Sequence, residues 1–167
     1  NPGTGSRQNQ PYGGVAMNLL FVARTGVFEA LSVGLGYLDQ EEQLESSSVF
    51  GDMQTEKTGE LIYLGKAQDG NEVYCVGNKY PDIVVRINEE IKSLAGQVDS
   101  PLKLMPVSVP GTESIYTLSR LAMLPLVGNY FTRLAKSSTL HHKDELVSSG
   151  KTLRDSITGK AAAKPLK

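Results

Sequence analysis

Cysteine is nearly absent: the 167 residues include one cysteine, two histidines and no tryptophan. One thiol cannot form a disulfide within the chain, which excludes a small secreted scaffold stapled by disulfides. Cys75 lies in an apolar run, Val-Tyr-Cys-Val. Free cysteine is among the most buried residue types, so we interpret Cys75 as a small core residue rather than a reactive thiol.

The residues needed for common catalytic and metal sites are also missing. His141 and His142 are adjacent, so their side chains diverge on a helix or a strand, and no second cluster of ligands accompanies them. The Gly-x-Ser-x-Gly elbow, the Walker phosphate loop and the Gly-x-Gly-x-x-Gly fingerprint are all absent. We therefore expect no metal, no cofactor and no catalytic residue, and we favour a protein that is not an enzyme.

Long apolar runs and an excess of one charge are absent as well. No run of about 18 apolar residues exists, so no membrane-spanning helix is expected. The 17 basic and 18 acidic residues give a formal net charge of −1, which offers no basis for nucleic-acid binding. The N-terminus lacks the basic start and apolar core of a secretory signal. We expect a cytoplasmic protein.

Composition divides the chain into three parts. Residues 1–16 are rich in Gly, Pro, Asn and Gln and are expected to form a disordered lead-in. Residues 17–157 have ordinary globular composition and are expected to form a single α/β domain. Residues 158–167 read TGKAAAKPLK and are expected to be a disordered basic tail.

The stretch 17–39 organises the predicted domain. Residues 19–23 are apolar and predict a buried strand, and Arg24-Thr25-Gly26 predicts a tight turn with Thr25 as a helix N-cap. The helix that follows is expected to end near Tyr37. Its core face comprises Val27, Leu31, Leu35 and Leu38.

The middle of the chain predicts a surface excursion, a hairpin and a helix. Residues 39–60 are polar and acidic, with a short helical turn expected at 41–45. Residues 61–65 and 72–77 predict two strands joined at Asp69-Gly70, a favoured hairpin turn. A helix is expected from Pro81 to a cap at Gly96. Its predicted core stripe comprises Val84, Ile87, Ile91 and Leu94.

The last third predicts an edge strand and three helical segments. Pro106 cannot donate to a strand ladder, so the strand at 102–109 is placed at an edge or given a bulge. Two apolar helices, 115–124 and 126–134, are separated by Pro125, and a weakly amphipathic last helix follows. The fold class is therefore α/β, a small layered domain of about four strands covered by helices.

The apolar helices around Pro125 have two interpretations. They are either core, or an exposed patch that docks a partner, with Arg120, Arg133 and Lys136 at its border. The residues that we assign to the docking interpretation are Leu118, Leu121, Leu126, Tyr130 and Phe131.

The turn after the first strand also has two interpretations. Backbone N–H groups at a helix start favour anions, and Arg24 adds a forked donor suited to phosphate or carboxylate. Arg24, Thr25 and Gly26 are therefore candidate ligand-binding residues, together with the N–H groups of Val27 and Phe28. In the other interpretation Thr25 simply caps the helix and Arg24 is a solvated turn residue.

Three blocks of the chain carry a resemblance to a known family. The most specific is the hairpin, Gly-Glu-Leu-Ile-Tyr-Leu-Gly-Lys at 59–66 followed by Asp-Gly-Asn-Glu-Val-Tyr at 69–74 and Gly77. The others are Ile-Asn-Glu at 87–89 with Leu94, and residues 119–135. Together, over about 17–154, they resemble a family of small bacterial proteins from spore-forming Firmicutes, domain of unknown function number 3189.

The resemblance implies an α/β fold and no established activity. It also implies a Tyr-Gly-Gly-x-His-Ser-Ser-like loop after the first strand, a candidate phosphate-binding or catalytic loop. This chain instead has Ala-Arg-Thr-Gly-Val-Phe at 23–28, without the paired glycines, the histidine or the serines. No catalytic residue is therefore carried over from the family.

These observations lead to one preferred function and one alternative. We expect a non-catalytic cytoplasmic module that uses its apolar C-terminal helices to bind another protein or a second copy of itself. A peripheral membrane contact is less favoured. The alternative is a protein or enzyme that binds a phosphate- or nucleotide-containing ligand at the turn after the first strand.

Overall fold

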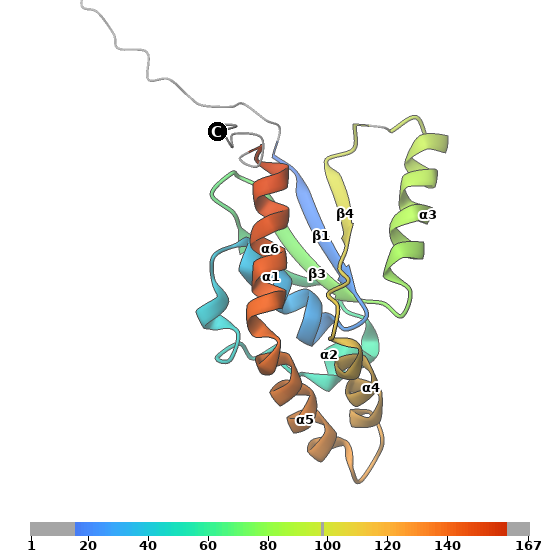
Figure 1. Ribbon diagram of the computed structural model, residues 1–167. Coiled ribbons are helices and arrows are strands. Elements are labelled where there is room, and N and C mark those ends of the chain that lie inside the picture. The colour runs from blue at the N-terminus through green and yellow to red at the C-terminus, as the bar shows by residue number, and fades with distance from the viewer. Residues whose placement is uncertain (1–15, 98, 160–167) are drawn as a thin grey trace, which may run out of the picture.

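The computed structural model describes residues 16–97 and 99–159 and contains one four-stranded mixed sheet (Figure 1). Strands β1 (Asn18–Ala23), β3 (Glu72–Gly77) and β4 (Leu102–Pro106) are parallel, and β2 (Ile62–Lys66) pairs antiparallel with β3. The strand order is β2-β3-β1-β4. The α/β class and the hairpin are thus confirmed, whereas the expected lead-in and tail fall almost entirely outside the described residues.

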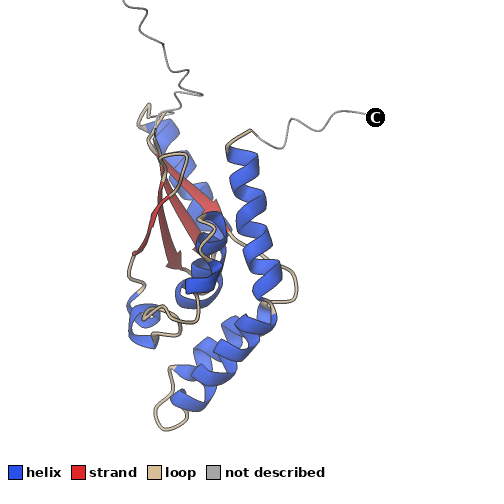
Figure 2. Cartoon of the chain, turned by 90° about the vertical axis from the view of Figure 1, so that its left-hand side faces the viewer, coloured by secondary structure: helices blue, strands red, loops and turns tan. Residues whose placement is uncertain are grey.

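Helices cover the two faces of this sheet unequally. The helical elements are η1 (Gly26–Ala30), α1 (Leu31–Tyr37), η2 (Glu41–Gln43), α2 (Met53–Thr58), α3 (Pro81–Leu94), α4 (Glu113–Ala122), α5 (Gly128–His141) and α6 (Lys143–Ile157). The α1 helix lies on one face with α6 outside it, and α3 lies on the other face (Figure 2). The main core forms on the α1 face, where Leu19, Phe21 and Cys75 are fully buried.

The first strand, turn and helix form as the sequence predicted. The Thr25 Oγ1 atom accepts a hydrogen bond from Glu29 N at 3.0 Å, which confirms Thr25 as the N-cap. The helix opens with one π-helical turn, in which Ala30 N donates to Thr25 O at 3.0 Å, and it ends at Tyr37. Within this wider first turn, the Thr25 hydroxyl also donates to the Glu29 carboxylate at 2.9 Å.

Two further expectations have clear outcomes. The β4 strand lies at the edge of the sheet and ends at Pro106, as the missing N–H of proline requires. The acidic stretch 39–60 contains a second helix, α2, that the sequence pattern did not predict. Asp52 caps this helix by accepting from Gln54 N at 3.0 Å, and Gly59 ends it at a φ of 65°.

The predicted core stripe of α3 is wrong. Ile87, Ile91 and Leu94 are exposed, with 90% of Leu94 open to solvent. Instead, the side of the helix that carries Lys92 faces the sheet. The Lys92 Nζ atom donates to the carbonyl oxygen of Leu102 on the edge strand. An amphipathic pattern identifies an apolar face, but it does not show which other element covers that face.

This arrangement makes a prediction about stability. Ile91→Ser should change the free energy of unfolding by less than about 0.5 kcal/mol, because the Ile91 side chain is 59% exposed. Leu31→Ala is the matched core variant and should cost about 2–5 kcal/mol, because Leu31 is buried. Urea unfolding of dilute protein measures both. If Ile91→Ser lowered the free energy of unfolding as much as Leu31→Ala, Ile91 would belong to the core after all.

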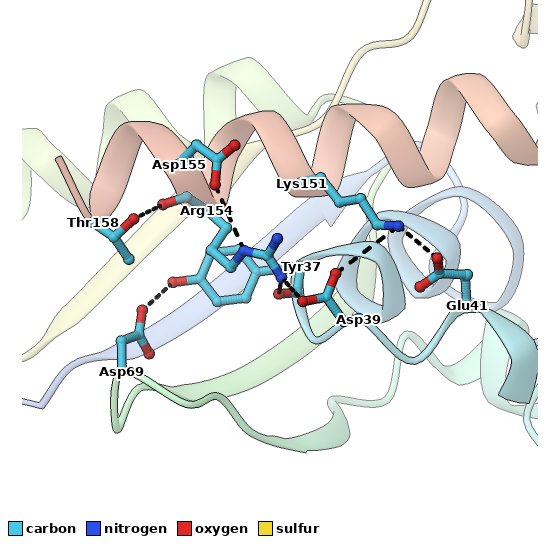
Figure 3. Close-up of polar contacts among 8 residues, drawn as sticks. All are labelled: Tyr37, Asp39, Glu41, Asp69, Lys151, Arg154, Asp155 and Thr158. Atoms are coloured by element: carbon cyan, nitrogen blue, oxygen red, sulfur yellow. Dashed lines mark hydrogen bonds and ion pairs between the residues drawn. The ribbon is translucent and has the colours of Figure 1, made fainter. Parts of the chain in front are cut away.

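A polar cluster ties the end of α1 to the C-terminal half of α6 (Figure 3). Arg154 donates to the Tyr37 carbonyl at 3.2 Å and pairs with the Asp39 carboxylate, and Lys151 pairs with Glu41 at 2.5 Å. The Tyr37 hydroxyl donates to Asp69 Oδ2 at 2.9 Å, and burial raises the pKa of Tyr37 to about 12. These contacts anchor α6 along α1.

Candidate functional site

The turn after β1 is held by two glutamates from different elements, Glu29, which is buried, and Glu56, which is half-buried. Glu29 accepts from the Thr25 hydroxyl at 2.9 Å and from the Thr112 hydroxyl at 2.8 Å. Burial raises the pKa of Glu29, and the hydrogen bonds from Thr112 and Thr25 offset part of that rise. Glu29 therefore joins the β1 turn to the loop that precedes α4.

Glu56 of α2 occupies the start of the first helix. Its Oε2 accepts from Gly26 N at 2.8 Å and from Val27 N at 2.9 Å. Burial raises the pKa of Glu56, and the same two hydrogen bonds act in the opposite direction. The Val27 N–H group that the sequence assigned to a ligand thus already binds a carboxylate of the chain itself.

Two glycines bring the ends of β1 and β3 into direct contact. A Cβ atom at Gly26 would lie 2.6 Å from Gly77 N, and one at Gly77 would lie 2.5 Å from Gly26 N. Only glycine permits this approach, because a side chain on either residue would overlap the opposing backbone. The approach places Asn78 and Lys79, which follow β3, beside Arg24.

Two adjoining clefts open at this carboxyl edge of the sheet and share Arg24 and Lys79. One has a volume of about 240 Å³, and its lining includes Glu56, Tyr116 and Arg120. The Arg24 guanidinium lies over the Tyr116 ring, 6.0 Å from its centroid. The other has a volume of about 270 Å³, and its lining includes Glu29, Tyr80, Ile83, Val107, Val109 and Thr112.

The three ligand-binding candidates predicted from the sequence differ in their exposure. Arg24 is exposed and lines both clefts, whereas Thr25 and Gly26 are buried in the turn. Sequence reasoning missed Glu56, Lys79 and Tyr116. Glu29 could have been found from the sequence, because it is an acidic residue among the apolar residues of the helix. Glu56 could not, because it is one of many acidic residues in a polar stretch.

The second candidate surface is the tip of the hairpin formed by α4 and α5. This hairpin projects away from the sheet (Figure 2). We define the α4–α5 tip as Leu124, Leu126, Val127 and Tyr130, all exposed. Leu126 is fully exposed and has a φ of 73°, a conformation that a leucine rarely adopts.

The hairpin is core on its inner side only. Ile115, Ala122 and Ala135 are buried. Of the residues assigned to docking, Leu126 and Tyr130 are exposed, and Leu118, Leu121 and Phe131 are half-buried. The inner side of the hairpin is therefore core and its tip is exposed, and docking of a partner stays a prediction.

Two features are absent from the part of the chain that the structure describes. Within 16–97 and 99–159, no group of three or more His, Cys, Asp or Glu side chains is placed to hold a metal ion. No helix in this part of the chain is long and apolar enough to cross a membrane. Cys75 is fully buried, and burial raises its pKa, so it remains a protonated thiol in the core.

The strand order and the clefts define a small doubly wound α/β protein with an open carboxyl edge. Residues 32–112 match the model of a family described as "Protein of unknown function (DUF3189)", so the chain is similar to this family from α1 to the start of α4. No curated protein and no solved structure matches. The β1 turn and the α4–α5 tip lie outside the matched residues.

Proposed function

We propose that this protein is a non-catalytic interaction module that docks its α4–α5 tip onto a second copy of the chain. The carrying observation is the exposure of Leu126 in a strained conformation. A left-handed leucine costs about 1–2 kcal/mol relative to the usual helical conformation, and full exposure returns no packing energy within the monomer. A partner that covers the side chain supplies the missing contact.

The second copy offers a matching apolar surface. We define the α3 face as Ile83, Ile87, Ile91 and Leu94. Nine of the twelve exposed large hydrophobic residues lie on the α4–α5 hairpin or on the α3 face. Paired apolar patches of this kind are typical of interaction surfaces. The two surfaces lie at different ends of the molecule, so one chain cannot cover its own tip (Figure 1).

Charge supports the same pairing. Residues 114–142 contain no aspartate or glutamate, and they carry Arg120, Arg133 and Lys136. The α3 helix carries three acidic and two basic residues, and its pairs Arg86–Glu90 and Lys92–Glu89 leave a net charge of −1. A cationic hairpin and a slightly acidic helix attract each other at contact, which favours this orientation over tip-to-tip contact.

Sedimentation velocity tests the proposal between about 1 and 300 µM protein, the range expected for a weak contact. The average mass of the native protein should rise with concentration. Leu126→Asn and Ile91→Asp should each remain monomeric, and Ser148→Asp, on the exposed side of α6, should behave as the native protein. Leu126→Asn should unfold no more easily than the native chain, because asparagine tolerates a positive φ.

Mixing the two variants distinguishes the geometry. Each variant keeps one intact surface, so a tip-to-α3 contact predicts that an equimolar mixture forms dimers and nothing larger. A native protein that stays monomeric throughout, or an Ile91→Asp variant that still associates, would overturn the proposal. Strong destabilisation by Leu126→Asn would also overturn it, since the tip would then belong to the core.

A further inference from the structure

We propose that the cleft of about 240 Å³ at the carboxyl edge of the sheet binds the phosphoryl group of a small phosphorylated molecule. The proposal is independent of docking at the α4–α5 tip. It rests on cationic side chains that three separate segments bring together, and not on the start of the first helix, whose Gly26 and Val27 N–H groups are already bound by Glu56.

Three cations line this cleft. Arg24 follows β1, Lys79 follows β3, and Arg120 comes from α4. Among the residues that the structure describes, none of the three forms an ion pair; their recorded contacts are with the Tyr116 ring, the Tyr80 ring and the Met123 sulfur. Like charges repel one another, and the one carboxylate in this cleft, that of Glu56, offsets only part of their charge. Their gathering in one cleft therefore favours an anion that pairs with all three.

The charge balance of the cleft fits a phosphate monoester. Glu56 also lines it and contributes one negative charge, which leaves an excess of two positive charges. A phosphate monoester carries about two negative charges at neutral pH. The two guanidinium groups each present paired N–H donors suited to phosphate oxygens, and Lys79 adds a compact point charge.

The position in the fold agrees with this assignment. The chain leaves β1 toward β3 through α1 on one face and leaves β3 toward β4 through α3 on the other face. The direction of winding thus reverses between β1 and β4. In open α/β sheets, ligands bind outside the carboxyl ends of the strands at such a reversal. The adjoining cleft of about 270 Å³ lies there, between Arg24 after β1 and Val107 after β4. The phosphoryl cleft borders it on the β3 side and shares Arg24 and Lys79 with it.

The adjoining cleft sets the size and chemistry of the rest of the ligand. It shares Arg24 and Lys79 with the phosphoryl cleft and has a volume of about 270 Å³. Its apolar lining includes Ile83, Val107 and Val109. Its polar lining includes Thr112 and three carboxylates, Glu29, Asp82 and Glu113, so this side of the site favours a neutral or cationic group over a second anion. Each cleft is smaller than the usual range of about 300–1,000 Å³, which suits a small phosphomonoester better than a dinucleotide.

Calorimetric titration with phenyl phosphate and inorganic phosphate, at ionic strength held constant with sodium chloride, tests the inference. We expect saturable binding of both and tighter binding of phenyl phosphate. Arg24→Ala and Arg120→Ala should each raise the Kd at least tenfold. Arg86→Ala is the matched control, because it removes an exposed arginine of α3 that lines neither cleft, and its Kd should be unchanged.

A thermal scan gives a second readout. Phenyl phosphate at ten times its Kd should raise the unfolding midpoint by about 3–5 °C in the native protein and in Arg86→Ala, but not in Arg24→Ala. Absence of saturable binding would overturn the inference. Equal weakening by Arg24→Ala, Arg120→Ala and Arg86→Ala would also overturn it, since the effect would then be one of net charge.

Discussion

Glu56→Ala is expected to lower the free energy of unfolding by about 2–4 kcal/mol, because it removes one acceptor from two N–H groups in a buried turn. Glu56 Oε2 accepts from Gly26 N at 2.8 Å and from Val27 N at 2.9 Å. Alanine has no side-chain acceptor, so both N–H groups would lose this hydrogen bond. Urea unfolding followed by circular dichroism measures the loss.

Glu56→Gln is the informative control. Its carbonyl oxygen can accept both hydrogen bonds without carrying a charge, so this variant should lie within about 1 kcal/mol of the native protein at pH 7. Glu60→Ala, an exposed acidic residue just beyond α2, should be neutral. If Glu56→Ala were as stable as Glu60→Ala, the carboxylate would not hold the turn.

The pKa of Glu56 adds a pH dependence with a definite sign. Burial raises its pKa in the folded protein above the ordinary value of 4.5. The native state therefore binds more protons than the unfolded state between pH 4.5 and the raised value. The part of the stability that comes from this proton uptake is full below pH 4.5 and is lost as the pH rises through the raised pKa, whereas the two hydrogen bonds are accepted in either protonation state. Glu56→Gln should flatten the stability curve in this window.

Gly150→Ala is expected to cost about 3 kcal/mol, although helix propensity alone predicts a gain of about 1 kcal/mol. A Cβ atom at Gly150 would lie 2.1 Å from the Val33 carbonyl oxygen and 2.7 Å from Tyr37 N. Both atoms belong to the backbone of α1, so neither can rotate away. The α6 helix would have to move off α1 and weaken the cluster around Arg154.

Ser148→Ala is the matched control for this variant. It makes an alanine two residues earlier on the exposed side of the same helix, so only helix propensity acts, and stability should be unchanged or slightly raised. Unfolding in urea should separate the two variants clearly. Equal stability of Gly150→Ala and Ser148→Ala would mean that α1 and α6 do not pack backbone to backbone.

Local chemistry accounts for the elements that could be predicted. The apolar run at 19–23, the Asp69-Gly70 turn and the Thr25 cap each act over a few residues, and the structure contains each of them. Pro106 likewise indicated an edge strand, because it has no N–H group to donate to a neighbouring strand. The same kind of signal failed for α3, whose pattern was read correctly as amphipathic and wrongly as buried.

The candidate sites depended on contacts that no local pattern contains. Glu56 reaches Gly26 across 30 residues, and Arg120 joins Arg24 in a cleft from a different helix. The sequence by itself determined the strands, the hairpin, the helix cap and the apolar character of the segments around Pro125, because these depend on backbone preference and periodicity. Only the tertiary structure decided which apolar faces stay exposed and which charges meet, because burial and charge pairing depend on elements far apart in the chain.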